Sequence, residues 1–114
     1  MLKWKNQRKS MYHREWKCIC PKDTANGFIN YLSETGIKDT QVINDCTGYH
    51  VLRRELEGEI EITFVSFWLE LEMMKQYTGD NLYKAVLYPE DEKYRIRPDT
   101  EVKVYKVISG ITAT

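Results

Sequence analysis

Residues 59–68, EIEITFVSFW, carry the clearest strand pattern in the chain. The first half alternates acidic and aliphatic side chains, as in a strand with one face in a core and the other in water. From Phe64 to Trp68 both faces become apolar, apart from Ser66. The segment therefore predicts a strand that is covered on one face along its length and on both faces at its end.

Three other segments are expected to be strands. Residues 49–56 (YHVLRREL) should form a hairpin with the segment above around Gly58, and residues 100–108 (TEVKVYKVI) should form the last strand. The first strand is expected at residues 11–20 (MYHREWKCIC), where Arg14 interrupts a face of aromatic and sulfur side chains. The members of that face are Tyr12, Trp16, Cys18 and Cys20.

A helix is expected after the first strand. Asp23 or Thr24 can cap it, because a side-chain oxygen there can accept a hydrogen bond from a free amide of the first turn. Its apolar side chains have the i, i+3, i+4, i+7 spacing of one buried face. They are Ala25, Phe28, Ile29 and Leu32. Gly36 is expected to end this helix in a left-handed conformation, Gly27 to allow a close approach to the sheet, and residues 37–47 to be irregular.

A second helix is expected at residues 69–78, ending at Gly79, although the alternation of LELEMM leaves a strand open there. A short helix at residues 81–88 and a charged loop at residues 90–98 precede the last strand. The order β-α-β-β-α-(short α)-β predicts an α+β, ferredoxin-like fold, an antiparallel sheet with its helices on one face.

Helices on one face would leave the other face of the sheet in water, yet the ends of the third and fourth strands are apolar on both sides. Exposing them would give an apolar patch larger than soluble monomers usually carry. We therefore expect a homodimer with twofold symmetry, in which the sheet of a second copy covers this face.

The bulk properties limit the classes of function. The chain has 114 residues, enough for one domain, and its 17 basic and 17 acidic residues give no net charge, which argues against nucleic acid as a partner. No apolar run has the length of a membrane helix, and no secretory signal is recognisable. An odd number of cysteines (Cys18, Cys20 and Cys46) then indicates reduced thiols and a cytoplasmic protein. We expect a basic extension at residues 1–10, the domain at 11–108 and a tail at 109–114.

Five segments carry a more specific pattern. They are VLRRE (51–55), FVSFW (64–68), YTGD (77–80), AVLYPED (85–91) and VKVYKV (102–107). In this order and spacing they resemble the antibiotic biosynthesis monooxygenase family of dimeric α/β-barrel proteins, and the match spans roughly residues 11–108. In that family a strand ending in Ser-x-Trp leads into the second helix. The resemblance implies a dimeric α/β barrel with a pocket for a small molecule.

The activities of this family differ, so the resemblance leaves the function open. Some members oxidise polycyclic phenols without a cofactor. Others degrade haem and use an axial His on the second helix, but residues 69–78 contain no His, so we expect no haem. We also expect no metal, because the cysteines lack the Cys-x-x-Cys spacing of a zinc site.

The resemblance places Trp68 at the mouth of the barrel, where its indole would pack on a flat substrate; the alternative is that it fills the core. Other side chains expected at the pocket are Trp16, Phe64, Tyr49, Tyr88, Tyr105, Arg53 and His50. For each tyrosine the alternative is a half-buried ring, and for Arg53 and His50 it is a structural or exposed side chain. His13 or His50 could act as a base near neutral pH.

The sequence therefore predicts a dimeric protein that binds a small, flat, hydrophobic molecule. Two hypotheses remain for the fate of the bound molecule. The protein is either a cofactor-independent monooxygenase that oxidises it, or a non-catalytic binding or stress-related module that only holds it.

Overall fold

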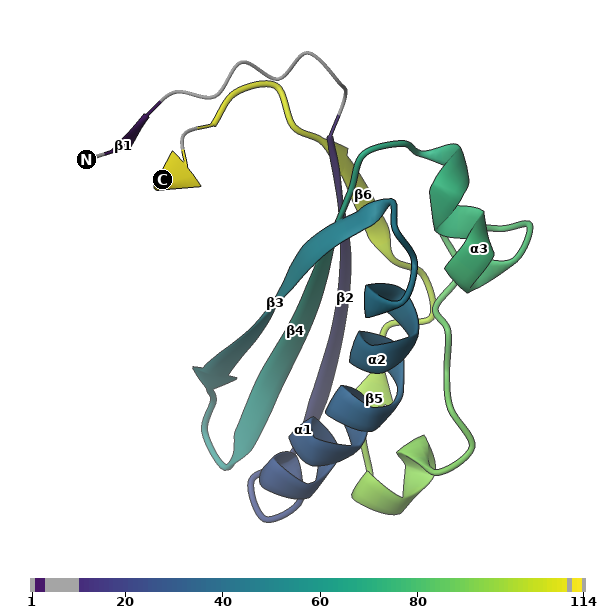
Figure 1. Cartoon of the computed structure of the whole chain (residues 1–114). Helices are drawn as coiled ribbons and strands as arrows, with labels where there is room; N and C mark the ends of the chain where they lie inside the picture. Colours follow the sequence, from purple (N-terminus) through teal and green to yellow (C-terminus); the bar gives the residue numbers. More distant parts are fainter. Residues whose placement is uncertain (1, 4–10, 111, 114) are drawn as a thin grey trace.

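A computed structural model describes residues 2–3, 11–110 and 112–113 of the chain (Figure 1). Five strands of the described residues form one antiparallel sheet in the order β3-β4-β2-β5, and β6 pairs with β2 on the same edge as β5. All of the helices lie on one face of this sheet. The α+β, ferredoxin-like fold expected from the sequence is confirmed; the sheet is open, not closed into a barrel.

The three long strands match the predicted ones closely. They are β2 (Tyr12–Pro21), β3 (Cys46–Glu55) and β4 (Glu59–Trp68). Gly58, with a φ of 74°, makes the turn of the expected hairpin between β3 and β4. Alternation along β2 and β4 sends every second side chain under the helices, which buries Trp16 opposite Phe64.

The last part of the sheet is shorter than expected. Strand β5 (Arg97–Pro98) lies within the predicted charged loop, together with the short helix η2 (Asp91–Tyr94), and β6 (Lys103–Lys106) covers only the middle of residues 100–108. Strands β1 (Leu2–Lys3) and β7 (Thr112–Ala113) pair with each other. The rest of the predicted extension, and residues 111 and 114 of the tail, lie outside the described residues.

Helix α1 (Ala25–Glu34) buries Ala25, Phe28 and Leu32 against the sheet, as its spacing predicts. The expected side-chain cap is absent, because the Thr24 hydroxyl donates to the carbonyl of Tyr94 instead, at 2.7 Å. Gly27 does allow a close approach, but to η2: a Cβ there would lie 3.0 Å from Tyr94 Cε1.

The prediction that Gly36 ends the helix in a left-handed conformation is wrong. A second helix, α2 (Gly36–Gln41), begins at this residue within the segment expected to be irregular, and its φ is not positive. The glycine serves close packing instead: a Cβ there would lie 3.1 Å from the Tyr77 hydroxyl and 3.4 Å from Phe64 Cε2.

The helices predicted after β4 are also corrected. Residues 69–78 form only η1 (Glu72–Met74) and α3 (Lys75–Thr78), because Asp45 binds the amides of Leu69 and Glu70. Residues 81–88 form no helix. Instead the amide of Ala85 donates to Thr100 O and that of Val102 to Tyr83 O, which holds the segment extended. We call residues 79–90 the covering segment.

In the described part of the chain, no helix has both the length and the hydropathy needed to cross a membrane.

Candidate functional site

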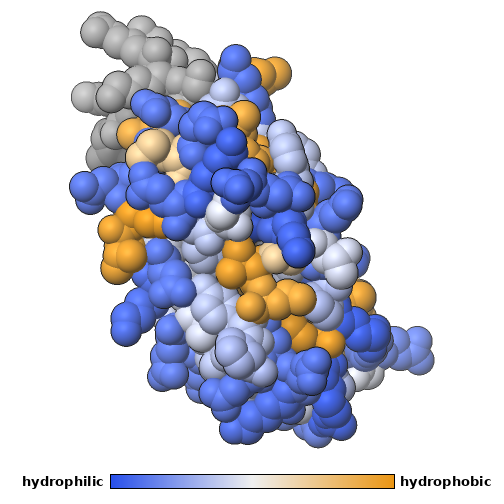
Figure 2. All heavy atoms as spheres, turned by 90° about the vertical axis from the view of Figure 1, so that its right-hand side faces the viewer, coloured by the Kyte–Doolittle hydropathy of each residue, from blue (hydrophilic) through white to orange (hydrophobic). Residues whose placement is uncertain are grey.

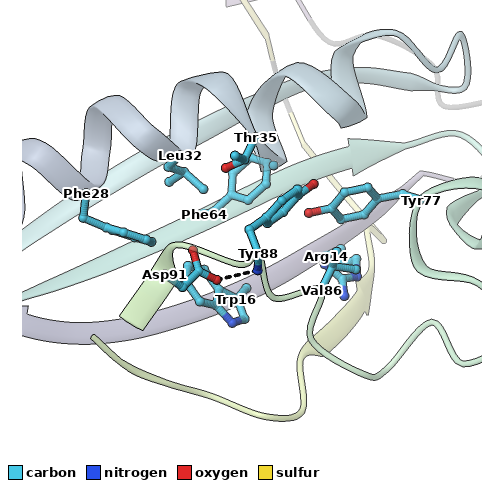
Figure 3. Close-up of a pocket in the computed structure, with 11 residues that line it drawn as sticks. Arg14, Trp16, Phe28, Leu32, Thr35, Phe64, Tyr77, Val86, Tyr88 and Asp91 are labelled. Carbon is cyan, nitrogen blue, oxygen red and sulfur yellow. Dashed lines mark hydrogen bonds between the residues drawn. The ribbon is translucent and has the colours of Figure 1, made fainter. Parts of the chain in front are cut away.

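A small cavity lies between α1, the sheet and the covering segment (Figure 3). Its volume of about 20 Å³ is enough for one water molecule. We call it the inner cavity. Its lining residues are Arg14, Trp16, Phe28, Leu32, Thr35, Gly36, Phe64, Tyr77, Val86, Tyr88 and Asp91.

One end of the inner cavity is aromatic and rigidly packed. The ring centroids of Trp16 and Phe28 are 6.1 Å apart, and Phe28 meets Tyr94 edge-on with centroids 5.9 Å apart. The indole of Trp16 donates to the carbonyl of Asp99 at 3.1 Å. These contacts fix two flat apolar surfaces, from β2 and from α1, beside the cavity.

The other end of the inner cavity contains Arg14, which is only 3% exposed. Its Nε donates to Leu82 O at 3.3 Å and its Nη2 to Lys84 O at 2.8 Å, so the guanidinium ties the covering segment to β2. The guanidinium carbon also lies 5.5 Å from the centroid of the Tyr77 ring. Burial lowers the pKa of Arg14, and the neighbouring tyrosines oppose that shift.

Two tyrosine hydroxyls face each other at the centre of the site (Figure 3). The hydroxyl of Tyr88 donates to Asp39 Oδ2 at 2.6 Å, and the hydroxyl of Tyr77 points toward that of Tyr88. Burial raises the pKa of both phenols. Both phenols are therefore neutral near pH 7, and the single hydroxyl proton of Tyr88 is donated to the exposed carboxylate of Asp39.

Asp91 holds the covering segment from the other side. Its carboxylate accepts from the amide of Tyr88 at 2.7 Å, and burial raises its pKa (Figure 3). The amide of Glu90 donates to the hydroxyl of Tyr31 at 3.1 Å. Tyr88 is thus fixed at its backbone and at its hydroxyl.

A larger groove lies outside Tyr88. Its volume is about 490 Å³, and Tyr88 and Asp91 line both this outer groove and the inner cavity. The remaining lining residues are Leu87, Pro89, Glu92, Ile96 and Pro98. The side of the molecule that carries the covering segment and α3 is mostly hydrophilic, with hydrophobic patches across its middle (Figure 2). Tyr88 and Asp91 therefore lie at the boundary between a one-water cavity and a larger groove.

The structure brings three of the predicted pocket residues together: Trp16, Phe64 and Tyr88 all line the inner cavity. Trp68 lies outside it. Its indole is completely buried in a second core cluster with Met74 and donates to Ser66 Oγ at 2.8 Å.

The other predicted residues also lie outside the inner cavity. Tyr49 and Arg53 are on the helix-facing side of β3 but exposed, and Arg53 binds Asn26 and Glu55. His50 and Tyr105 are on the opposite face of the sheet, since they pair with Val65 and His13.

The sequence reasoning missed Arg14, Tyr77, Asp39 and Asp91 as site residues. Only Arg14 left a signal, as the one charged side chain on an otherwise apolar strand face. Among the described residues no group of three His, Cys, Asp or Glu side chains is arranged to hold a metal ion. The three cysteines are buried, and burial raises the pKa of each thiol.

Comparison with solved structures supports the resemblance noted in the sequence. A Bacillus cereus protein, named provisionally as an antibiotic biosynthesis monooxygenase, aligns with 90% of this chain and 98% of its own, with 18% identity and a TM-score of 0.63. At this identity the likeness shows the fold alone. A de novo designed protein, Foldit4, aligns with 93% of this chain and 99% of its own at 15% identity and a TM-score of 0.48.

No protein-family model matches the chain. The search of curated proteins likewise gave no match. The class defined by fold and site is therefore an α+β domain with the fold of that Bacillus cereus protein and an aromatic cavity beneath its helices.

Proposed function

We propose that this protein binds a small, flat, hydrophobic molecule between the aromatic side chains of the inner cavity. The observation that carries the proposal is the position of Trp16, Phe28 and Phe64, which present three apolar rings to one space from three elements. Buried sites for small molecules are mostly apolar with a few polar groups that fix orientation, and Arg14 and Tyr77 are such groups here.

Binding requires the inner cavity to open, because 20 Å³ holds no more than one water. Rotation of the Tyr88 side chain would join the cavity to the outer groove of about 490 Å³, and the combined space has the size typical of a ligand pocket. The rotation breaks the hydrogen bond from the Tyr88 hydroxyl to Asp39. It leaves the hydrogen bond from the backbone amide of Tyr88 to the Asp91 carboxylate, so the covering segment stays attached.

A second candidate function is oxidation of the bound molecule by O2 without metal or flavin. The fold shared with a protein named as a monooxygenase favours it. In this reaction an electron-rich substrate, such as a phenol or quinol, would itself supply the electrons that reduce oxygen. The Tyr77 hydroxyl and the Arg14 guanidinium, which both line the inner cavity, would stabilise the phenolate form.

Oxygen uptake with a panel of phenols and quinols separates the two candidates. Turnover supports the monooxygenase, and tight binding with no oxygen consumption supports the binding module. Trp16→Phe and Trp68→Phe form a matched pair, since each removes one buried indole. Loss of turnover or of binding in Trp16→Phe alone assigns the substrate to the inner cavity. The same loss in Trp68→Phe alone assigns it to the position implied by the family resemblance.

We also propose that the protein is a homodimer, joined through the sheet face that bears no helix. Leu52 is 52% and Tyr105 48% exposed on this face. Beside them Phe67 packs between His13 and His50, with ring centroids 4.5 and 5.0 Å apart. A stable interface here should bury over about 1,000 Å². Sedimentation at low micromolar concentration tests the dimer: Leu52→Asp should give monomers, and a monomeric wild type would contradict it.

A further inference from the structure

Arg14 is a buried cation without a counter-ion. It is 3% exposed, and none of the ion pairs formed by the described residues includes it. Only two of its three nitrogens are used, Nε and Nη2, and both partners are neutral carbonyls of the covering segment. Nη1 donates to no described residue, and it is not fully enclosed, since no fully buried side-chain nitrogen or oxygen of the described residues lacks a partner.

The burial of this cation is compensated only in part by the groups around it. A guanidinium stays charged at all physiological pH values, and moving it out of water is unfavourable unless an anion or enough dipoles replace the lost hydration. Two carbonyl oxygens replace it only in part. Tyr77, whose ring centroid lies 5.5 Å from the guanidinium carbon, and Tyr88 also line the cavity, and both phenols are neutral rather than anionic. The Arg14 end of the cavity is therefore positively charged, whereas the one carboxylate among the lining residues, that of Asp91, lies at the other end.

The polar end and the apolar end of the cavity are separate. In Figure 3 Arg14 and Tyr77 lie on one side of Tyr88, whereas Asp91, Trp16 and Phe28 lie on the other. A carboxylate beside the aromatic end would repel an anion placed there. One orientation of a charged ligand is consequently favoured over the reverse.

We propose that the bound molecule is an aromatic carboxylate, with one carboxylate oxygen at Arg14 Nη1, the second at the Tyr77 hydroxyl, and the ring system between Trp16, Phe28 and Phe64. The inference deepens the proposed function and rests on it. A carboxylate suits the site because its two oxygens accept from two donors at once, and a charge-assisted hydrogen bond to a guanidinium is stronger than a neutral one.

Isothermal titration of the full chain with three naphthalene derivatives tests the proposal. The probes are 2-naphthoate, 2-naphthamide and 2-naphthol, which share the ring system and differ in the polar group. Wild type should bind 2-naphthoate at least about tenfold more tightly than the other two at neutral pH. Arg14→Gln keeps a donor for the carbonyls but removes the charge, so it should abolish that preference.

Arg95→Gln is the matched control. Arg95 is exposed, pairs with Asp23 and lies outside the inner cavity, so its variant should keep the full preference. Equal binding of all three probes by wild type, or a preference unchanged in Arg14→Gln, would overturn the proposal that the ligand is a carboxylate. Neither result would contradict the binding of a flat molecule in the inner cavity. Binding of no probe would overturn the proposed function as well. If Arg14→Gln fails to fold, the affinities of the three probes for wild type still test the preference for a carboxylate.

Discussion

The hydroxyl of Tyr88 donates to Asp39 Oδ2 at 2.6 Å, and this bond links the covering segment to α2 over the inner cavity. The two residues are 49 positions apart, on elements that no local pattern connects. Because Tyr88 also lines the outer groove, we propose that breaking this bond joins the groove to the cavity.

Tyr88→Phe should accelerate ligand binding. Without the hydroxyl the ring keeps its place by packing alone, so the open state becomes more populated. Removing one hydrogen bond should lower the free energy of unfolding by about 1 kcal/mol. Stopped-flow fluorescence with 2-naphthoate should show a faster association rate than in wild type. Tyr83→Phe, a change to an exposed ring in the same segment, is the control; equal rates in all three proteins would contradict the gating role.

Gly36→Ala should weaken ligand binding without unfolding the protein. The added methyl would lie 3.1 Å from the Tyr77 hydroxyl and 3.4 Å from Phe64, in space that the ligand needs. We expect the dissociation constant of 2-naphthoate to rise about tenfold. Alanine has the better helix propensity, which offsets part of the crowding in the stability of the fold.

Gly27→Ala is the companion variant for this experiment. Its methyl would lie 3.0 Å from Tyr94 Cε1, an equally tight contact outside the inner cavity. Titration should show wild-type affinity in this variant. A similar loss of affinity in both variants would indicate a general disturbance of α1 and α2 rather than a filled cavity.

His13 should make the fold less stable in acid. Burial, and secondly the nearby His50, lower the pKa of His13 below its ordinary value of 6.5. The unfolded chain therefore takes up this proton first, and the stability contributed by the neutral ring is present above pH 6.5 and lost as the pH falls through the lowered pKa. Other groups on this face near the ring are Glu15, Lys103 and Tyr105.

Thermal unfolding measured between about pH 7.5 and pH 5 tests this linkage. Wild type should lose stability over this range, and His13→Gln should lose less of it. An identical pH profile for the two proteins would show that His13 does not contribute. The ring lies on the sheet face proposed for the dimer, so the measurement should be made at a single protein concentration.

The strands could be predicted from the sequence because alternation is a local signal. The predicted bounds of β4 agree with the structure, and those of β2 and β3 agree to within three residues. The covering segment could not be predicted. Its shape depends on two long-range hydrogen bonds, from the amide of Ala85 to Thr100 O and from the amide of Val102 to Tyr83 O. Taken alone, the sequence of residues 81–88 is compatible with a short helix.

The candidate site could be predicted only in part for a related reason. Trp16 and Trp68 both lie on the helix-facing side of neighbouring strands, and the sequence does not distinguish them. The strand register distinguishes the two tryptophans. Trp16 pairs with Phe64 in the middle of the sheet, whereas Trp68 pairs with Tyr12 at its end, where it packs with Met74. Arg14 is visible in the sequence as an interruption, but its role depends on carbonyls 68 and 70 residues away.

Opening of the inner cavity at Tyr88 to admit a flat aromatic molecule is tested most directly by a crystal structure of the protein with 2-naphthoate. We predict the ring system between Trp16 and Phe64, with the Tyr88 hydroxyl turned away from Asp39. A ligand bound elsewhere, with the Tyr88–Asp39 bond intact and the cavity unchanged, would contradict it.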